Sequence, residues 1–178
     1  SSKSNRSIGN GLGREVQLFR TLRGHMSGIL EGVRIVDISR ILAGPYATQI
    51  LADLGAEVIK IEAPWGDDTR QWGPPFTTGF DGKKVAAYFL ACNRRKEILT
   101  IDLKQQTDEV LKLIKTADVV VENFRPGTLE RLLGPMPEDV ILCSISAYGQ
   151  DGPRRDEPGY DIALQARSGI MSITGDTN

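Results

Sequence analysis

The sequence predicts an α/β fold built on a mainly parallel sheet with helices on both faces. From Gly32 onward, apolar runs of strand length alternate with segments that repeat apolar residues at helical spacing. The first strand, helix and strand follow one another within about 30 residues, which is typical of a right-handed parallel crossover. The run 118–122 has three consecutive valines at its centre, as expected for a strand covered on both faces.

The first crossover shows the local signals most clearly. Residues 33–38 form a buried strand, and residues 39–44 turn out of it. Pro45 suits the first turn of a helix, because an N–H group there would have no helical partner. The helix continues to Gly55, a typical C-terminal cap, and residues 56–62 form the next strand.

The alternation continues to the end of the chain. Residues 63–84 form a loop, and a loop of this length is often functional. Thr107 is expected to cap a helix, with two acidic residues after it at the positive end of the dipole. Cys92 and Cys143 fall at the end of one expected strand and within another, which argues against a disulfide scaffold and favours a reducing compartment. The other expected elements are strands at 85–91, 98–103, 118–122 and 140–146, and helices at 128–133 and 160–171.

The composition excludes several classes of function. The 178 residues are 40% apolar and 25% charged, which fits one domain, or one domain with a tail. A net charge of −1 lacks the basic excess that a nucleic-acid surface needs. No apolar run of about 18 residues is present, so no membrane span is expected. Because His25 is the only histidine, no metal site and no internal Ser-His-Asp triad are expected.

The first 28 residues differ in composition from the rest. They hold five basic residues against one acidic residue and are rich in Ser and Gly. This composition is typical of a mitochondrial presequence. The alternatives are a cloning remnant, suggested by Gly24-His25-Met26, and a structural arm. We expect residues 1–28 to be disordered and the protein to be mitochondrial, or otherwise cytoplasmic.

The carboxyl ends of the strands are the expected ligand edge, because ligands of open α/β sheets bind there. These ends combine small residues, aromatic residues and arginines at 39–44, 62–64, 122–127 and 146–149. The mixture favours a ligand with an apolar part and anionic groups. The N-terminus of a helix that follows such a strand end can also bind an anionic group. Glu62 lies where a dinucleotide ribose would be bound, but the absence of a G-x-G-x-x-G motif disfavours a nicotinamide cofactor.

Several blocks of the sequence together resemble the class III CoA-transferase family. They are Leu42-Ala43-Gly44-Pro45-Tyr46-Ala47, Ala52–Glu62, Gly66–Arg70, Asn93-Arg94, Asp118–Gly127, Tyr148–Pro153, Gly159–Asp161 and Gln165–Gly175. The family includes formyl-CoA transferase, succinyl-CoA:dicarboxylate transferases and α-methylacyl-CoA racemase. The blocks agree in order and spacing over nearly all of residues 30–178. Residues 29–178 are therefore identified as the N-terminal part of the large domain, truncated before the family's small domain.

The resemblance implies a Rossmann-like domain, a homodimer of interlocked subunits, and transfer of coenzyme A between carboxylic acids. Acyl-CoA and a carboxylic acid are then the substrates, and no permanently bound cofactor is expected. An aspartate would attack the acyl thioester and pass through an aspartyl-CoA intermediate. The family places this aspartate beyond Asn178, and Asp176 lacks its context. We therefore identify no catalytic residue in this chain and expect the chain alone to be inactive.

The resemblance also implies a coenzyme A site. The matching positions are Ile41, Leu42, Ala43, Ile101, Leu103, Asn123, Phe124 and Arg131. Core packing is an equal alternative for Ile101 and Leu103, and a solvated helix face is one for Arg131. Basic residues of the family are replaced here by Ala63 and Pro158, so phosphate contacts would come partly from Arg40, Arg94 or Arg125.

Tyr160 and Asp161 are candidates for the acyl-substrate site. Racemases of the family carry a histidine at the position of Tyr160, and tyrosine, with a reference pKa of about 10, is a weak base at neutral pH. Asp161 either orients groups at the site or caps the last helix. The run 67–76 is similar to dicarboxylate transferases and favours transfer from succinyl-CoA to a dicarboxylate such as glutarate. The alternatives are a 2-methylacyl-CoA racemase and a non-catalytic fragment that binds coenzyme A or forms dimers.

Overall fold

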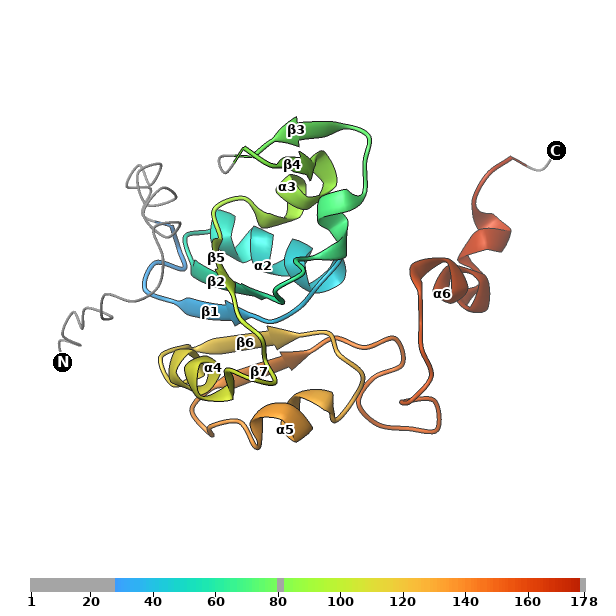
Figure 1. The fold of residues 1–178 in the computed structure, drawn as a ribbon. Coiled ribbons are helices and arrows are strands. Elements are labelled where there is room, and N and C mark those ends of the chain that lie inside the picture. Colours follow the sequence, from blue (N-terminus) through green and yellow to red (C-terminus); the bar gives the residue numbers. More distant parts are fainter. Residues whose placement is uncertain (1–27, 80–81, 177–178) are drawn as a thin grey trace.

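The computed structural model describes residues 28–79 and 82–176 of the chain (Figure 1). The expected presequence lies outside the described residues, apart from Gly28. Five parallel strands form the central sheet in the order β5-β2-β1-β6-β7. Their bounds are β1 (Arg34–Asp37), β2 (Glu57–Glu62), β5 (Glu97–Thr100), β6 (Val119–Glu122) and β7 (Ile141–Ser144). This order is that of a doubly wound Rossmann sheet, so the predicted fold class is confirmed.

Helices cover both faces of the sheet. Helix α2 (Ala43–Asp53) lies on one face, and α4 (Thr107–Ile114) and α5 (Thr128–Leu133) lie on the other (Figure 1). Each face has its own apolar cluster, because neighbouring residues of a strand point to opposite sides. On the α4 and α5 face, Val36, Ile59 and Val120 pack against the two helices. The smaller cluster on the α2 face includes Ile35, Ala52, Val58 and Val121.

The segment between β2 and β5 corrects one prediction. It contains a 3-10 turn, η1 (Asp68–Gln71), and an antiparallel hairpin of β3 (Phe76–Thr78) and β4 (Lys84–Ala86). The strand expected at 85–91 is wrong, because β4 ends at Ala86 and helix α3 (Ala87–Asn93) follows at once. Phe89, Cys92 and Asn93 are buried at helical spacing, so Cys92 belongs to a helix, while Cys143 lies in β7 as expected.

The cap predicted at Thr107 is also wrong. Thr107 is the first residue of α4 and follows the capping position, Gln106. Its hydroxyl group donates a hydrogen bond back to the carbonyl oxygen of Leu103 at 3.1 Å, instead of accepting one from an N–H group ahead. The acidic first turn of this helix is confirmed, with Asp108 and Glu109 at its positive end.

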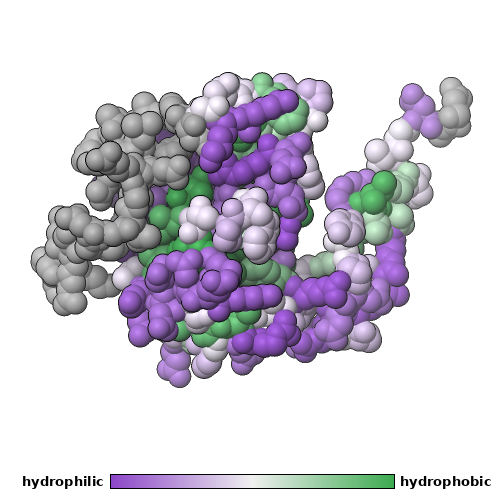
Figure 2. All heavy atoms as spheres, in the orientation of Figure 1, coloured by the Kyte–Doolittle hydropathy of each residue, from purple (hydrophilic) through white to green (hydrophobic). Residues whose placement is uncertain are grey.

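The C-terminal segment forms an arm beyond the layered body (Figure 1). The helix expected at 160–171 is divided into α6 (Asp161–Ser168) and the 3-10 turn η2 (Ile170–Ile173) by Gly169, whose φ is 81°. Neither element buries a residue, and hydrophobic residues of the arm stay exposed, whereas hydrophilic residues cover much of the body (Figure 2). No helix among the described residues is long and apolar enough to cross a membrane.

Candidate functional site

The topological switch point of the sheet lies between β1 and β6, since β1 leads to α2 on one face and β6 to α5 on the other. Ligands of doubly wound sheets bind at such a point. The structure brings the segments after the two strands together. The Asn123 side chain accepts a hydrogen bond from the Arg40 N–H at 2.9 Å and donates one to the Arg40 carbonyl at 2.8 Å. The loop that contains the predicted residues Ile41, Leu42 and Ala43 is thus joined through Arg40 to the segment of Asn123 and Phe124.

The loop that follows β1 ends at an open helix N-terminus. Leu42 and Ala43 are exposed, and no side chain caps α2. The first turn of this helix has no acidic residue, so the N–H groups and the dipole are available to an anion. The helix also approaches the loop closely, because a Cβ atom on Gly44 would lie 2.1 Å from the Ser39 hydroxyl oxygen.

A buried group of charged side chains lies beneath this loop, on the carboxyl half of the face that α2 covers. Lys96 and Asp37 are fully buried and form an ion pair at 3.0 Å. The Lys96 ammonium also donates to Thr48 at 2.8 Å and to the Pro45 carbonyl at 2.7 Å. Asp37 further accepts hydrogen bonds from the N–H and hydroxyl groups of Ser39 and from the Thr48 hydroxyl. These contacts fix the loop to the sheet.

A second buried ion pair lies beside the first. The Lys60 ammonium pairs with Asp67 at 3.2 Å and donates to the Ser39 carbonyl at 2.9 Å. Next to it, the Glu62 carboxylate accepts two hydrogen bonds from the Arg70 guanidinium, at 2.8 and 3.1 Å. This guanidinium also stacks over the Phe89 ring, 3.8 Å from its centre. Glu62 is therefore committed to an internal pair and is not free to bind a ribose.

Burial and neighbouring charges shift the pKa of two of these groups in opposite ways. Burial lowers the pKa of Lys96 to about 8, although Asp37 opposes the shift. For Asp67, burial alone would raise the pKa, but the Lys60 charge and hydrogen bonds from Thr69 lower it below the ordinary value. Asp67 is therefore a carboxylate at neutral pH. This charged group was not predicted from the sequence, although Lys60 and Glu62 lie on one face of the buried strand β2.

The other three predicted site residues belong to different elements. Ile101 follows β5 and is 2% exposed within the core, and Leu103 packs against the same apolar cluster. Arg131 is exposed on α5, where its guanidinium is 3.4 Å from the Thr128 hydroxyl. As coenzyme contacts, all three stay predictions.

The proposed alternative phosphate ligands differ in position. Arg40 is exposed at the ligand edge and pairs with Asp68. Arg125 is exposed in the segment that follows β6. Arg94 instead pairs with Asp53, at the far end of α2, about 15 Å along the helix from its N-terminus. Arg40 and Arg125 therefore remain candidates at this edge, and Arg94 does not.

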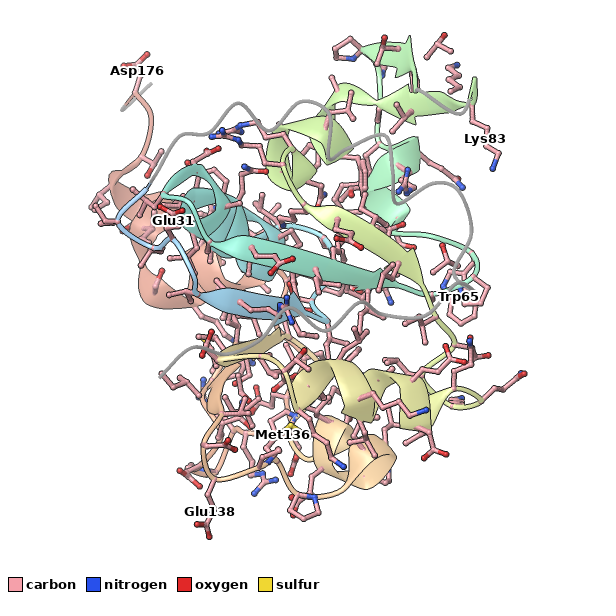
Figure 3. The ribbon with its side chains drawn as sticks, turned by 90° about the vertical axis from the view of Figure 1, so that its left-hand side faces the viewer. Glu31, Trp65, Lys83, Met136, Glu138 and Asp176 are labelled. Atoms are coloured by element: carbon pink, nitrogen blue, oxygen red, sulfur yellow. The ribbon has the colours of Figure 1, made fainter. Side chains whose placement is uncertain are left out.

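The substrate candidates Tyr160 and Asp161 belong to the arm. Tyr160 is 77% exposed, and Asp161 begins α6 and accepts a hydrogen bond from Gln165. Asp176 lies near the end of the arm, on the opposite side of the view from Trp65, which follows β2 (Figure 3). The roles of Tyr160 and Asp161 stay predictions.

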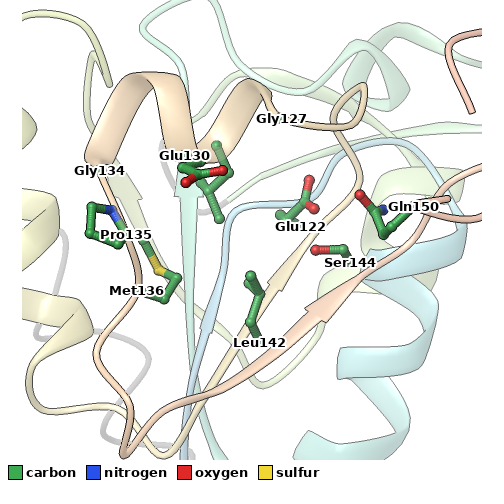
Figure 4. A pocket seen from close by; sticks show the side chains of 10 residues that line it. Glu122, Gly127, Glu130, Gly134, Pro135, Met136, Leu142, Ser144 and Gln150 are labelled. Atoms are coloured by element: carbon green, nitrogen blue, oxygen red, sulfur yellow. The ribbon is translucent and has the colours of Figure 1, made fainter.

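A separate hollow of about 250 Å³ lies between α5 and the strands β6 and β7 (Figure 4). The carboxylates of Glu122 and Glu130 line it, together with Met136, Ser144 and Gln150. No predicted site residue lines it. Two carboxylates in one small hollow disfavour a phosphate group. Within the described parts of the chain, no three His, Cys, Asp or Glu side chains are grouped to hold a metal ion.

The fold and the site together define a doubly wound α/β protein with an anion-suited edge at its switch point. The sequence profile of CoA-transferase family III matches residues 30–178, and the chain belongs to this family.

Named relatives are similar to the chain over most of its length. A succinate–glutarate CoA-transferase of Agrobacterium fabrum is 48% identical over 160 residues, covering 83% of this chain and 39% of the relative. A succinyl-CoA:glutarate CoA-transferase of Mus musculus is 46% identical over 155 residues, covering 82% of this chain and 34% of the relative. The chain therefore spans little more than a third of the length of these relatives.

Solved structures show the same fold. A crystal structure of a CaiB/BaiF family protein from Brucella suis superposes with a TM-score of 0.81 at 43% identity, covering 86% of this chain and 42% of that one. The crystal structure of Rv3272 from M. tuberculosis has a TM-score of 0.73 at 40% identity, covering 85% of this chain and 43% of that one.

Proposed function

We propose that this chain supplies the coenzyme A-binding edge of an enzyme that transfers CoA from succinyl-CoA to a dicarboxylate such as glutarate. The proposal rests on the loop after β1 at the switch point, where Leu42 and Ala43 are exposed. Two hydrogen bonds between Arg40 and Asn123 hold this loop to the segment of Asn123 and Phe124. The family membership and the names of the relatives support CoA transfer and this pair of substrates.

The chain's own residues would bind and orient the coenzyme. The exposed side chains of Leu42 and Ala43 offer an apolar surface to adenine and pantetheine. The open N-terminus of α2 and the exposed Arg40, Arg125 and Arg131 offer positive charge to the phosphates. The Asn123 amide is engaged with the main chain of Arg40, so it would act by holding the loop.

The transfer itself would use an aspartate from outside these 178 residues. Its carboxylate attacks the thioester carbonyl and expels the CoA thiolate, which leaves a mixed anhydride. The thiolate then attacks the aspartyl carbonyl, releases succinate and forms the aspartyl-CoA thioester. The acceptor carboxylate attacks this thioester and expels the thiolate again. Attack of the thiolate on the acceptor acyl group then gives the new acyl-CoA and the free aspartate.

Calorimetric titration of the chain with coenzyme A tests the binding step. We expect saturable binding, and Arg131→Ala should weaken it about fivefold if the guanidinium contacts a phosphate. Lys112→Ala is the matched control, because Lys112 is an exposed cation on the neighbouring helix α4. A titration without heat, or equal losses in both variants, would contradict the proposed site.

Turnover is tested on the complete protein, with succinyl-CoA and glutarate as substrates. The expected product is glutaryl-CoA, separated from succinyl-CoA by chromatography. Incubation with a 2-methylacyl-CoA in D2O is the companion assay. Exchange of the α-hydrogen without any transfer of CoA would replace the transferase proposal with a racemase.

A further inference from the structure

The loop that carries the proposed CoA contacts contains a residue in an unfavourable conformation. Ile41 has a φ of 68°, in the left-handed region. This region is uncommon for any residue with a side chain, and for a β-branched residue it is a clear outlier. Such a conformation persists only where the surrounding structure imposes it, and strained residues of this kind cluster at functional sites.

Asp67 and Lys60 hold the main chain at this strained residue and just before it. One Asp67 oxygen accepts a hydrogen bond from the Ile41 N–H at 3.1 Å and pairs with the Lys60 ammonium at 3.2 Å. The same ammonium donates to the Ser39 carbonyl at 2.9 Å. Both side chains are only 1% exposed. A single buried ion pair thus binds the loop's main chain on either side of Arg40.

The carboxylate of Asp67 is itself fixed in place. Its second oxygen accepts hydrogen bonds from the Thr69 N–H at 3.0 Å and the Thr69 hydroxyl at 2.7 Å. The Asp67 N–H points to the Glu62 carboxylate at 3.3 Å. Since Asn123 holds the main chain of Arg40, the loop is bound by side chains from three different parts of the chain.

We propose that Asp67, acting with Lys60, is a positioning residue that holds the loop at Ile41 in the conformation that receives coenzyme A. The inference rests on the proposed function, because the loop is the proposed CoA contact. Because its side chain is only 1% exposed, Asp67 would act without touching the ligand. It acts by ordering the loop before the ligand arrives, so that binding does not have to order it.

The first variant is Asp67→Asn, which removes the charge and weakens the hold on the Ile41 N–H. We expect faster hydrogen exchange in a peptide covering residues 38–44 and about a tenfold rise in the Kd for coenzyme A. Exchange in β6 should stay as in the parent chain. The matched control is Glu57→Gln, which breaks the Arg34–Glu57 pair of 2.9 Å at the opposite end of β1 and β2. It should change neither the loop exchange nor the Kd.

A second parent chain, Ile41→Gly, distinguishes a positioning role of Asp67 from a general loss of stability. Glycine adopts a positive φ without strain, so in an Ile41→Gly chain the loop depends less on Asp67. Adding Asp67→Asn to that chain should therefore raise the Kd by no more than about threefold. If Asp67 positions the loop, Asp67→Asn should change the Kd less in the Ile41→Gly chain than in the parent chain. A purely structural role would change the Kd equally in both chains.

If Asp67→Asn does not fold, the double variant Lys60→Met, Asp67→Leu takes its place. It removes the Lys60–Asp67 ion pair without leaving an unpaired buried charge, and such apolar replacements are often tolerated. The same expectations apply to it. The inference is wrong if loop exchange is unchanged in the folded variant, or if the Kd rises equally in both backgrounds. If the parent chain does not bind coenzyme A, the proposed function fails, and the exchange measurement still decides whether Asp67 holds the loop.

Discussion

Removing the ammonium of Lys96 should destabilise the fold by an amount that the structure sets. Lys96 is fully buried and donates to four groups, at 2.7 to 3.1 Å, on Asp37, Pro45, Thr48 and Asn93. Lys96→Met keeps most of the side-chain volume and removes all four hydrogen bonds. The variant therefore leaves the buried Asp37 carboxylate without its counter-ion.

The expected loss follows from what remains around Asp37. Breaking a buried ion pair by removing one partner costs about 3–5 kcal/mol. Asp37 would keep the hydrogen bonds from Ser39 and Thr48, so we expect the lower end, about 3 kcal/mol. This is a large part of the roughly 5–15 kcal/mol by which domains are stable. Adding Asp37→Asn to Lys96→Met should recover part of the loss, since no unpaired charge is then buried.

The pH dependence gives an independent check with a definite sign. The folded pKa of Lys96 is about 8, below the value of about 10.4 for an unfolded chain. Below pH 8 the ammonium is charged in both states, and its contribution is constant. Above pH 8 the unfolded chain holds a proton that the folded chain has lost, so the free energy of unfolding rises with pH. The slope is at most about 1.4 kcal/mol per pH unit.

The assay is urea denaturation of the parent chain and Lys96→Met, followed by circular dichroism from pH 7 to 9.5. The parent should be more stable by about 3 kcal/mol at pH 7, and the gap should widen above pH 8. Lys112→Met, at an exposed position of α4, is the control and should stay within about 0.5 kcal/mol of the parent. A loss no larger than that of the control, or a gap that narrows with rising pH, would refute the reasoning.

Substitutions at three further positions test the packing and the loop. Gly44→Ala should lower stability by about 1–3 kcal/mol despite the better helix propensity of alanine, because the new Cβ would lie 2.3 Å from the Ser39 Cβ; equal or higher stability in urea would contradict this. Asn123→Ala removes both hydrogen bonds to Arg40 and should cost about 1–3 kcal/mol, with weaker CoA binding by calorimetry; an unchanged Kd would mean that the loop is held without it. Ile101→Ala should cost about 2–5 kcal/mol by thermal or urea unfolding and Ile101→Val about 0.5–1.5, as expected for a core residue that is 2% exposed.

Much of the fold could be predicted because the strands of the sheet are short apolar runs with clear ends. Pro45 and Gly55 mark the first helix, and Gly55 has the positive φ of 104° that a C-terminal cap requires. The strand predicted at 85–91 was wrong for the opposite reason. Its residues are apolar throughout, and a short unbroken apolar run does not distinguish a strand from a buried helix. The burial of Phe89 and Cys92, three residues apart, resolves it as a helix.

The site was predictable only in part. The resemblance placed Ile41 and Asn123 at one edge, and the structure joins their segments through Arg40. The ion pairs beneath the loop could not be derived, because Asp37 and Lys96 are 59 residues apart and neither belongs to a motif with a known partner. One signal was available, since Lys60 lies in the middle of a parallel strand, and a buried lysine there requires a partner.

The face of the sheet beneath α2 has two halves that differ in polarity and in what they stabilise. Its amino half is apolar, with Ile35 and Val58 among its residues, and its carboxyl half carries Asp37 and Lys60. Apolar packing is non-directional, so it stabilises the layers but cannot hold a particular N–H or carbonyl group. A loop at a ligand edge has main-chain groups without sheet partners, and buried charges bind these groups in one arrangement. Because a buried ion pair adds little net stability, its use here is best explained by the loop conformation that it fixes.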